Sequence, residues 1–252
     1  MSLQFCFLLN VILVSRLIFT FTDYPVERKQ AATITVLQMM GLLAYETKYV
    51  LAVLAGTLII INVLFHFLEI KSKKINELRL LSLLAYVVVL SISFSPLVNL
   101  NFNSGLSSFV QSLGHYSFLF ALIKNVNWLK FNILLLGLLL VTNETNILIR
   151  YQFQIFDLAP RKEVETDKRI VTIIDKRAYN AGRVIGILER VLIYYFVLNA
   201  QFTAIGIILA AKSFTRFKEL ENREFAEYVL IGTLLSTLLA MVTAIMAKLL
   251  LL

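Results

Sequence analysis

Long apolar blocks alternate with short polar segments along most of this chain. Six blocks have about the twenty residues that a helix needs to cross a hydrocarbon core of roughly 30 Å. We expect helices, because the backbone must satisfy its own hydrogen bonds in lipid and no strand periodicity is evident. The pattern predicts an all-α polytopic membrane bundle of about six transmembrane helices, with five to seven compatible. The six blocks are 3–22, 49–68, 80–98, 128–150, 182–213 and 225–247.

Two further segments are ambiguous. The segment "AATITVLQMMGLLAY" (31–45) is short for a span and is predicted to be an interfacial or re-entrant helix. The segment "LSSFVQSLGHYSFLFALI" (106–123) is either a seventh, more polar span or a helix lying flat, and a seventh span would move the C-terminus to the other side. We therefore expect three parts: an N-terminal membrane region with four spans (1–158), a polar cytoplasmic connection (159–180) and a C-terminal helical hairpin (181–252).

The composition supports a membrane protein. Hydrophobic residues make up 59% of the chain and charged residues 16%, and the mean hydropathy is +0.80. Soluble domains are about 45–50% apolar and about 25% charged. The single Cys6 lies inside the first block, so no disulfide framework or cysteine metal motif is expected. The first block lacks the basic start and small-residue cleavage site of a signal peptide, and we expect it to be retained as a span.

The net charge is +8, and many basic residues stand at the ends of apolar blocks. There, Lys and Arg anchor helices and contact anionic lipid headgroups, so we expect the bilayer and no nucleic acid as a partner. A homo-oligomer, or other membrane or cytoplasmic subunits, are the expected protein partners. The loops 69–79 and 150–183 are strongly basic, which makes them cytoplasmic. With six spans both termini join them, although the basic segment 212–224 then faces outward.

The fifth block carries several charged and polar residues. Arg190 and Lys212 are separated by about 33 Å at 1.5 Å per residue, close to the hydrocarbon thickness. We expect both to lie at opposite interfaces, with Gln201 near the midplane and Arg183 in an extension beyond the membrane. At 100° per residue most of these residues share one stripe, while Glu189 points away from it. An anchored structural helix is favoured over a buried Glu189–Arg190 network.

Small residues recur every four positions in the sixth block. Such a ridge permits close helix approach, and Gly206 and Ala210 offer a matching patch on the fifth block. We expect a tight hairpin across residues 213–224, although the ridge could equally serve a homo-oligomer. Glu227 is expected near the headgroups, where a neighbouring cation can neutralise it. The ridge consists of Gly232, Ser236, Ala240 and Ala244.

His66 and Glu69 are three residues apart, a spacing that places both on one helix face and can bind a metal ion. Glu144 is a possible third ligand if the fourth helix continues past Thr142. The favoured interpretation is that His66 and Glu69 lie at the cytoplasmic interface, bonded to water and lipid. His115 is expected to be an interfacial polar residue. The sequence contains no Gly-rich phosphate loop and no nucleophile elbow, and we predict no catalytic residue and no cofactor.

The segment "AGRVIGILERVLIYYFVLNAQFTAIGIILAAKSFTRFKELENREFAEYVLIGTLLS" (181–236) resembles the C-terminal part of an uncharacterised prokaryotic multi-spanning membrane family, catalogued only as a domain of unknown function. The segment "HFLEIKSKK" (66–74) more loosely resembles the His-containing helix end of that family, with Glu69 where an Asp is expected. The resemblance implies a prokaryotic inner-membrane protein and no reaction. Its matching elements are Gly182-Arg183, Gly186 to Arg190, Ala211 to Ser213, Arg216-Phe217, Glu227-Tyr228 and Gly232-Thr233.

Packing motifs are plentiful and candidate chemistry is scarce. The sequence therefore favours a non-enzymatic scaffold or subunit of a larger membrane assembly. One alternative is a small-solute or ion channel or transporter that uses Gln201, Asn132 and the Arg190–Glu189 pair, although few of the spans look interrupted as transporter helices often are. Two others are a membrane-embedded metal-dependent enzyme using the His66 site and, from the prokaryotic setting alone, an effector that perturbs the bilayer.

Overall fold

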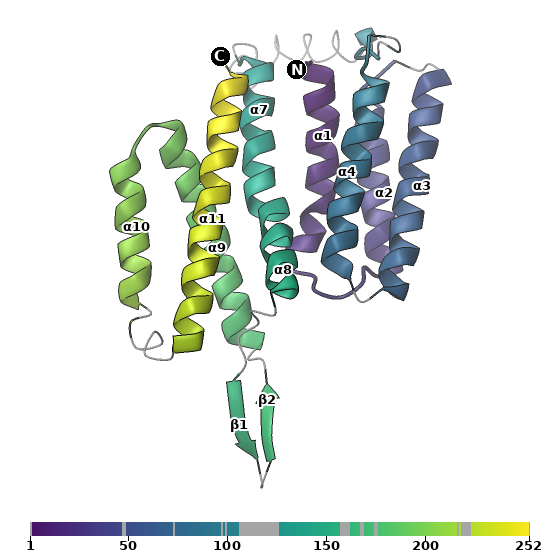
Figure 1. The fold of residues 1–252 in the computed structure, drawn as a ribbon. Coiled ribbons are helices and arrows are strands. Elements are labelled where there is room, and N and C mark those ends of the chain that lie inside the picture. The colour runs from purple at the N-terminus through teal and green to yellow at the C-terminus, as the bar shows by residue number, and fades with distance from the viewer. Residues whose placement is uncertain are drawn as a thin grey trace, which may run out of the picture. The chain divides into compact units, whose positions relative to one another are not determined.

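The fold of the described residues is a helical bundle with one small β-hairpin (Figure 1). The computed structural model describes residues 2–46, 49–72, 74–96, 98, 100–105, 126–156, 162–166, 169–173, 176–215, 217 and 223–251, and the side chains among them outside 162–181, 215 and 223–225. The predicted segment 106–123 therefore lies outside the described residues, as does His115. The helices are α1 (Leu3–Arg16), α2 (Arg28–Leu42), α3 (Tyr49–Lys71), α4 (Ile75–Ser93), α7 (Trp128–Leu139), α8 (Thr145–Ile155), α9 (Lys176–Leu198), α10 (Phe202–Thr215) and α11 (Arg223–Leu250).

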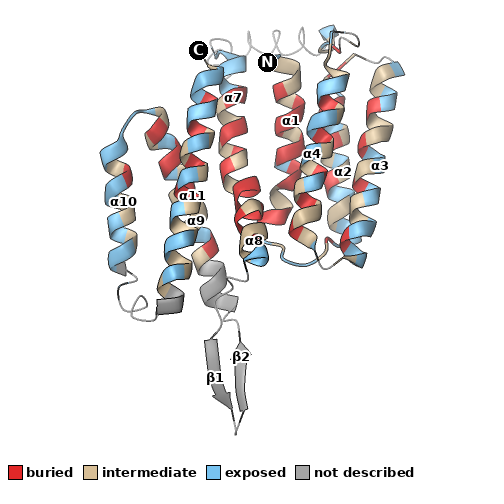
Figure 2. Cartoon of the chain, in the orientation of Figure 1, coloured by how far each residue is buried: buried red, intermediate tan, exposed pale blue. Residues whose placement is uncertain are grey.

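The predicted all-α class is confirmed, and by length and composition five described helical stretches could cross a membrane. Buried positions are frequent along α1 and α7, whereas few positions of α3 are buried (Figure 2). Only 17% of the α3 stretch is buried although its mean hydropathy is 2.4, so most of its surface is apolar and suited to lipid. The five stretches are Leu3–Thr20, Tyr49–Lys71, Ile75–Ser93, Trp128–Ile155 and Ala226–Leu250.

The chain divides into two compact units, residues 1–139 and 140–250. This division differs from the predicted one, because its boundary falls inside the fourth span rather than after it. At that point α7 gives way to a π-helical turn, η2 (Leu140–Glu144), before α8 begins. We call residues 1–139 unit 1 and residues 140–250 unit 2.

In unit 1, α1 packs against α2, α4 and α7, and α2 also packs against α3. The predicted interfacial or re-entrant helix is therefore a packed member of the bundle, as α2. The α1–α2 contact is close, because a Cβ added to Gly41 would lie 2.6 Å from Cγ1 of Val11. The adjoining Tyr45 is buried, which raises the pKa of its hydroxyl, and this hydroxyl donates a hydrogen bond to the carbonyl of Gln4.

The path of unit 1 corrects the predicted topology. The Tyr45–Gln4 hydrogen bond places the residues just before α3 beside the start of α1. At the other end, Arg79 of α4 bonds to Thr22 after α1 and to Glu69 near the end of α3. Helices α1 and α3 therefore run in the same direction, because α2 returns the chain between them. The start of α1 and the basic α3–α4 turn lie at opposite ends of unit 1, not at the same end.

In unit 2, α11 packs along α9 and α8. The connection predicted as a polar segment (159–180) contains an antiparallel hairpin of β1 (Lys162–Thr166) and β2 (Arg169–Ile173), whose register runs from Lys162 opposite Ile173 to Thr166 opposite Arg169. The predicted fifth span is wrong, because it is not one straight helix: α9 ends at Leu198 and α10 begins at Phe202.

The α9–α10 turn satisfies its own backbone. The amide of Gln201 donates to the carbonyl of Phe196, and the amide of Ala200 donates to the carbonyl of Val197. These two bonds, with Ala200 at a φ of 56°, form a Schellman cap in which alanine takes the left-handed position that glycine usually occupies. The chain then reverses, since Nζ of Lys212 lies 2.5 Å from Oε2 of Glu189.

Candidate functional site

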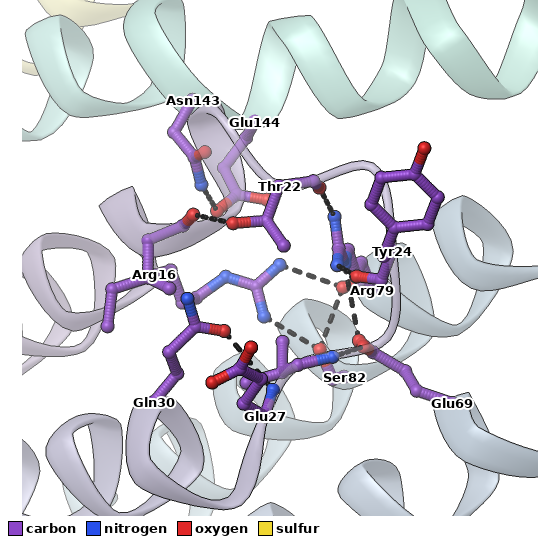
Figure 3. Close-up of polar contacts among 12 residues, drawn as sticks. Arg16, Thr22, Tyr24, Glu27, Gln30, Glu69, Arg79, Ser82, Asn143 and Glu144 are labelled. Atoms are coloured by element: carbon purple, nitrogen blue, oxygen red, sulfur yellow. Dashed lines mark hydrogen bonds and ion pairs between the residues drawn. The ribbon is translucent and has the colours of Figure 1, made fainter.

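A buried ion pair joins the ends of three helices in unit 1 (Figure 3). Nε of Arg79 lies 3.2 Å from Oε1 of Glu69, and both side chains are at most 5% exposed. The other guanidinium nitrogens of Arg79 donate to the carbonyls of Thr22 and Tyr24 at 2.6 and 2.9 Å. The second carboxylate oxygen of Glu69 accepts from the amide of Val26. The pair therefore holds the α1–α2 connection against α3 and α4.

Arg16 extends this cluster, and its side chain is also buried. It donates to Oγ of Ser82 at 2.7 Å and to the carbonyl of Arg79 at 2.8 Å. The guanidinium carbons of Arg16 and Arg79 lie 5.0 and 4.6 Å from the ring centroid of Phe19, which adds a cation–π contact to each. Two buried cations thus share contacts with the Glu69 carboxylate, several neutral oxygens and the ring of Phe19.

A chain of amide and hydroxyl contacts links all four of the first helices. The amide of Gln38 on α2 donates to Oγ of Ser15 on α1 at 3.1 Å and accepts from Asn62 on α3 at 2.9 Å. The hydroxyl of Tyr86 on α4 then donates to Oδ1 of Asn62. Interhelical polar contacts of this kind stabilise a membrane bundle by about 1 kcal/mol each. We therefore assign this chain of polar contacts a structural role.

Asn132, which the channel alternative used, makes a similar contact between α1 and α7. Nδ2 of Asn10 donates to the carbonyl and the Oδ1 of Asn132 at 2.9 and 3.0 Å. Both residues are buried. Asn132 therefore pairs with another amide within unit 1 and has a packing role.

A small pocket adjoins the Arg79–Glu69 pair. Its walls include Arg16, Asn62, His66, Glu69 and Tyr86, and the space inside is about 30 Å³. That volume suits one or two water molecules rather than a larger ligand. Nδ1 of His66 is buried and has no hydrogen-bond partner among the described residues, and a water molecule in the pocket would satisfy it.

The structure does not support the alternative of a metal site. His66 and Glu69 do line one pocket, but Glu69 is engaged by Arg79 and the amide of Val26. Glu144 accepts a hydrogen bond from Asn143 at 2.8 Å. Among the side chains that the structure describes, no group of three or more His, Cys, Asp or Glu is placed to hold a metal ion.

The central polar residue of unit 2 is Arg190 on α9, which is 3% exposed. Its Nε donates to the carbonyl of Val141 at 2.9 Å, and one terminal nitrogen donates to Oγ of Ser236 at 3.3 Å. The other terminal nitrogen is buried and has no hydrogen-bond partner among the residues that the structure describes. Val141 belongs to the π-helical turn, where the backbone pattern changes and a carbonyl is available to an outside donor.

The neighbours of Arg190 lie near the middle of two apolar stretches. Val141 is 13 residues after Trp128 and 14 before Ile155, and Ser236 is 10 residues after Ala226 and 14 before Leu250. At 1.5 Å per residue these positions are about 15–21 Å from either end of their helices. The prediction that Arg190 marks one end of a span is therefore wrong, since its guanidinium contacts the middle of both neighbouring helices.

The other residues predicted together with Arg190 have different surroundings. Glu189 and Lys212 form the ion pair between α9 and α10, with side chains 13% and 16% exposed, so Lys212 does not mark the far interface. Gln201 is exposed in the turn rather than deep in a helix. Glu227 is exposed in the first turns of α11. Arg183 is buried on α9, and its predicted place in an extension beyond the membrane stays a prediction.

The small-residue ridge of α11 packs on different helices from those predicted. Ser236, Ala240 and Ala244 are buried, and Ser236 receives Arg190 of α9. A Cβ on Gly232 would lie 2.9 Å from Cζ of Phe153 on α8. A Cβ on Gly206 of α10 would have no neighbour within 4 Å, and Ala210 is exposed. The predicted match between the ridge and the Gly206–Ala210 patch is therefore wrong.

Sequence reasoning missed Arg16, Arg79 and Gln38 as core residues. In the sequence, Arg16 interrupts the first apolar block and Arg79 closes the basic loop 69–79. The burial of Arg16 depends on contacts with residues more than 60 positions away, such as Ser82. Arg79 bonds to Thr22, 57 positions away, and Gln38 to Ser15 and Asn62, 23 and 24 positions away. A signal was present nevertheless, because an arginine inside an apolar block requires a partner or the interface.

Comparison with known proteins identifies no relative: no family model, curated protein or solved structure matches this chain. The resemblance of residues 181–236 to an uncharacterised membrane family stays a prediction.

Proposed function

We propose that this chain is a membrane channel or transporter for a small solute or ion, with its working site in unit 2 and a structural role for unit 1. The observation that carries the proposal is the reversal of the chain at 199–201, which leaves Arg190 against the middle of two apolar helices. Ionisable residues at such depth are costly and are typical of ion or substrate pathways. The scaffold hypothesis also took Arg190 and Lys212 as anchors at the two ends of one straight span, and that support is lost.

The α9–α10 hairpin supports the proposal by its length. Helix α10 has 14 residues, which is about 21 Å and too short for a hydrocarbon core of roughly 30 Å. Its self-capped turn leaves few backbone groups to be satisfied by water. We infer a re-entrant hairpin that enters and leaves the bilayer from one side. Interrupted helices at membrane depth are the usual surroundings of transporter binding sites.

The fourth span also contributes to this site. Its π-helical turn presents the carbonyl of Val141 to Arg190, and π-turns inside helices are frequent at functional sites. Two irregular backbones, the π-turn and the α9–α10 turn, therefore occur in the same unit. Irregular backbone at this depth is tolerated where it is buried in protein or lines a water-filled path.

The membrane location and orientation are part of the proposal. We propose a prokaryotic inner membrane with the basic α3–α4 turn in the cytoplasm, following the distribution of Lys and Arg. The N-terminus then lies outside, because α1 and α3 run in the same direction. A cysteine placed at Ser2, with Cys6 replaced by alanine, should react with an impermeant maleimide in intact cells. Reaction only after permeabilisation would contradict this orientation.

Flux through reconstituted vesicles tests the function directly. Purified full-length protein in liposomes should release a panel of monovalent ions and small polar solutes well above empty liposomes. Arg190→Met should lower that flux at least tenfold, whereas Lys248→Met, on an exposed residue in the last turn of α11, should leave it unchanged. Absence of flux for every solute, from protein that remains monodisperse and helical, would overturn the proposal.

A further inference from the structure

The Glu189–Lys212 ion pair lies at the depth of Arg190. Glu189 directly precedes Arg190 on α9, and one residue of a helix rises only about 1.5 Å. The guanidinium of Arg190 contacts Val141 and Ser236, near the middle of two apolar stretches. Nζ of Lys212 on α10 lies 2.5 Å from Oε2 of Glu189. The ion pair between α9 and α10 is therefore far from the ends of the neighbouring helices.

This pair is partly accessible, unlike the buried pair of unit 1. The side chains of Glu189 and Lys212 are 13% and 16% exposed, whereas those of the unit 1 pair are at most 5% exposed. Hydrocarbon is a costly neighbour for an ionised side chain. The accessible part of the pair therefore needs water beside it or a way to lose its charge. A proton fits such a site, because water delivers it and a nitrogen lone pair binds it without any cavity.

The two units pair a carboxylate with different cations. The guanidinium of Arg79 in unit 1 keeps its proton under all physiological conditions, whereas the amine of a lysine can give its proton up. The cation of the unit 2 pair can therefore be discharged. If Lys212 releases its proton, Glu189 retains a counter-charge in Arg190, because these two charges already attract each other.

We propose that Lys212 is a proton carrier, so that the ion which the proposed channel or transporter moves, alone or together with a solute, is the proton. The ammonium of Lys212 gives one proton to a water molecule and becomes a neutral amine that stays hydrogen-bonded to Glu189. The amine then takes one proton from water on the other side, which restores the ion pair. One proton has crossed, and no electron is transferred. This inference rests on the proposed function.

Helix α10 is suited to move with the proton. Of the side chains described on α10, only Ile205 is buried, so the helix is held by a narrow seam and by the ion pair. A neutral amine makes a weaker hydrogen bond to a carboxylate than an ammonium does. Loss of the proton from Lys212 therefore loosens the end of α10 that is farther from the 199–201 turn, and the amine can then meet water on the other side.

Other charged groups surround the pair without replacing either member. Among the described side chains, Lys212 is the partner of Glu189 in the ion pair and the hydrogen bond that this carboxylate makes. Arg150 of α8 lies close enough to Arg190 for the two positive charges to repel each other. The cation that contacts Glu189 and can release a proton is therefore Lys212. Further charged residues described on α9, η2 and α11 are Arg183, Glu144, Glu227 and Lys248.

Proton flux is measured with the full-length protein in liposomes that contain the pH-sensitive dye pyranine. Valinomycin and an outward potassium gradient make the lumen negative, and the panel of solutes is added outside or left out. Wild-type protein should acidify the lumen at least tenfold faster than empty liposomes in one of these conditions. Lys212→Arg keeps a cation beside Glu189 but cannot release a proton, so it should lower this rate at least tenfold. Lys248→Arg, on an exposed residue in the last turn of α11, should leave the rate unchanged.

A second variant separates proton transfer from a structural role. Lys212→Met removes both the charge and the proton and should lose proton flux as Lys212→Arg does; a structural ion pair would instead be rescued by arginine. Wild-type rates of proton flux in monodisperse Lys212→Arg would overturn the inference. Solute flux by the wild type without any proton movement would overturn the inference and leave the proposed function standing. Absence of all flux would overturn the proposed function, and the carrier role with it.

Discussion

Both units bury arginine, but they hold it differently. In unit 1, every nitrogen named in the Arg79 contacts has an oxygen partner, one of them the carboxylate of Glu69. In unit 2, Arg190 has two neutral acceptors and one nitrogen with none. A fully matched charge fixes helices in place, whereas an incompletely matched buried charge costs stability and is more typical of a functional position. The difference separates the structural unit from the candidate working site.

The largest effect should come from breaking the matched pair. Arg79→Leu leaves Glu69 as a buried carboxylate without its cation and should lower the free energy of unfolding by about 3–5 kcal/mol. Reversible unfolding in mixed micelles, followed by far-UV circular dichroism, measures this. Lys74→Ala is the control, because the Lys74–Glu77 pair is largely exposed and should contribute less than about 1 kcal/mol. Equal, small effects of both substitutions would remove the structural role assigned to the cluster.

Two glycine substitutions sharpen the description of unit 2. Gly232→Ala forces a Cβ to 2.9 Å from the ring of Phe153 and should destabilise the protein by about 1–3 kcal/mol. Gly206→Ala meets open space and should be neutral or stabilise α10 by up to about 1 kcal/mol. The same unfolding assay compares them. A destabilising Gly206→Ala would restore the predicted packing of α10 on the ridge of α11.

Removing Arg190 should lower the free energy of unfolding far less than removing Arg79. Arg190→Met leaves the carbonyl of Val141 without its donor but removes a buried charge that has no carboxylate partner. We expect the lost hydrogen bond and the removed buried charge to compensate each other. The free energy of unfolding should then change by no more than about 1 kcal/mol in either direction. A loss above about 3 kcal/mol in the same micelles would mean that Arg190 is a matched structural charge like Arg79, and the contrast between the units would disappear.

The smallest effect concerns the turn between α9 and α10. Ala200 has a φ of 56°, a conformation that costs a residue with a Cβ about 1–2 kcal/mol relative to its usual regions. Ala200→Gly removes this cost and adds chain entropy to the unfolded state, so the net gain should be at most about 1 kcal/mol. The midpoint of thermal unfolding should rise by a few degrees or less. A lower midpoint would indicate that residues 199–201 are not in this turn.

Much of the fold could be predicted from hydrophobicity alone. Blocks of about twenty apolar residues indicated the spans of α1, α3, α4, the fourth span and α11, because length and hydropathy are local properties. The break in the fifth block escaped prediction because neither glycine nor proline marks it; Ala200 takes the left-handed position, and only the polar Asn199 and Gln201 flank it. A continuous apolar pattern cannot distinguish a straight helix from one that reverses.

The candidate site was harder to predict for a related reason. Arg190 could be placed on one face of a helix by its periodicity, but its depth depended on whether the helix was straight. Once the chain reverses, the same residue moves from an expected interface to the middle of two neighbouring helices. The direction of Glu189 was also determined by a residue on α10, Lys212, that a straight helix would place about 35 Å away. Local patterns predicted the helices but not the contacts between them.

The reversal of the chain at 199–201 is the claim on which the account depends, and a distance between two spin labels tests it most directly. With Cys6 replaced by alanine, cysteines at the exposed positions Ile185 and Phe214 can carry the labels. The structure predicts a distance below about 25 Å, because packed helix axes lie about 8–10 Å apart and the labels add the remainder. A straight helix would separate the two positions by about 44 Å, and a distance near that value would contradict the hairpin and the site built on it.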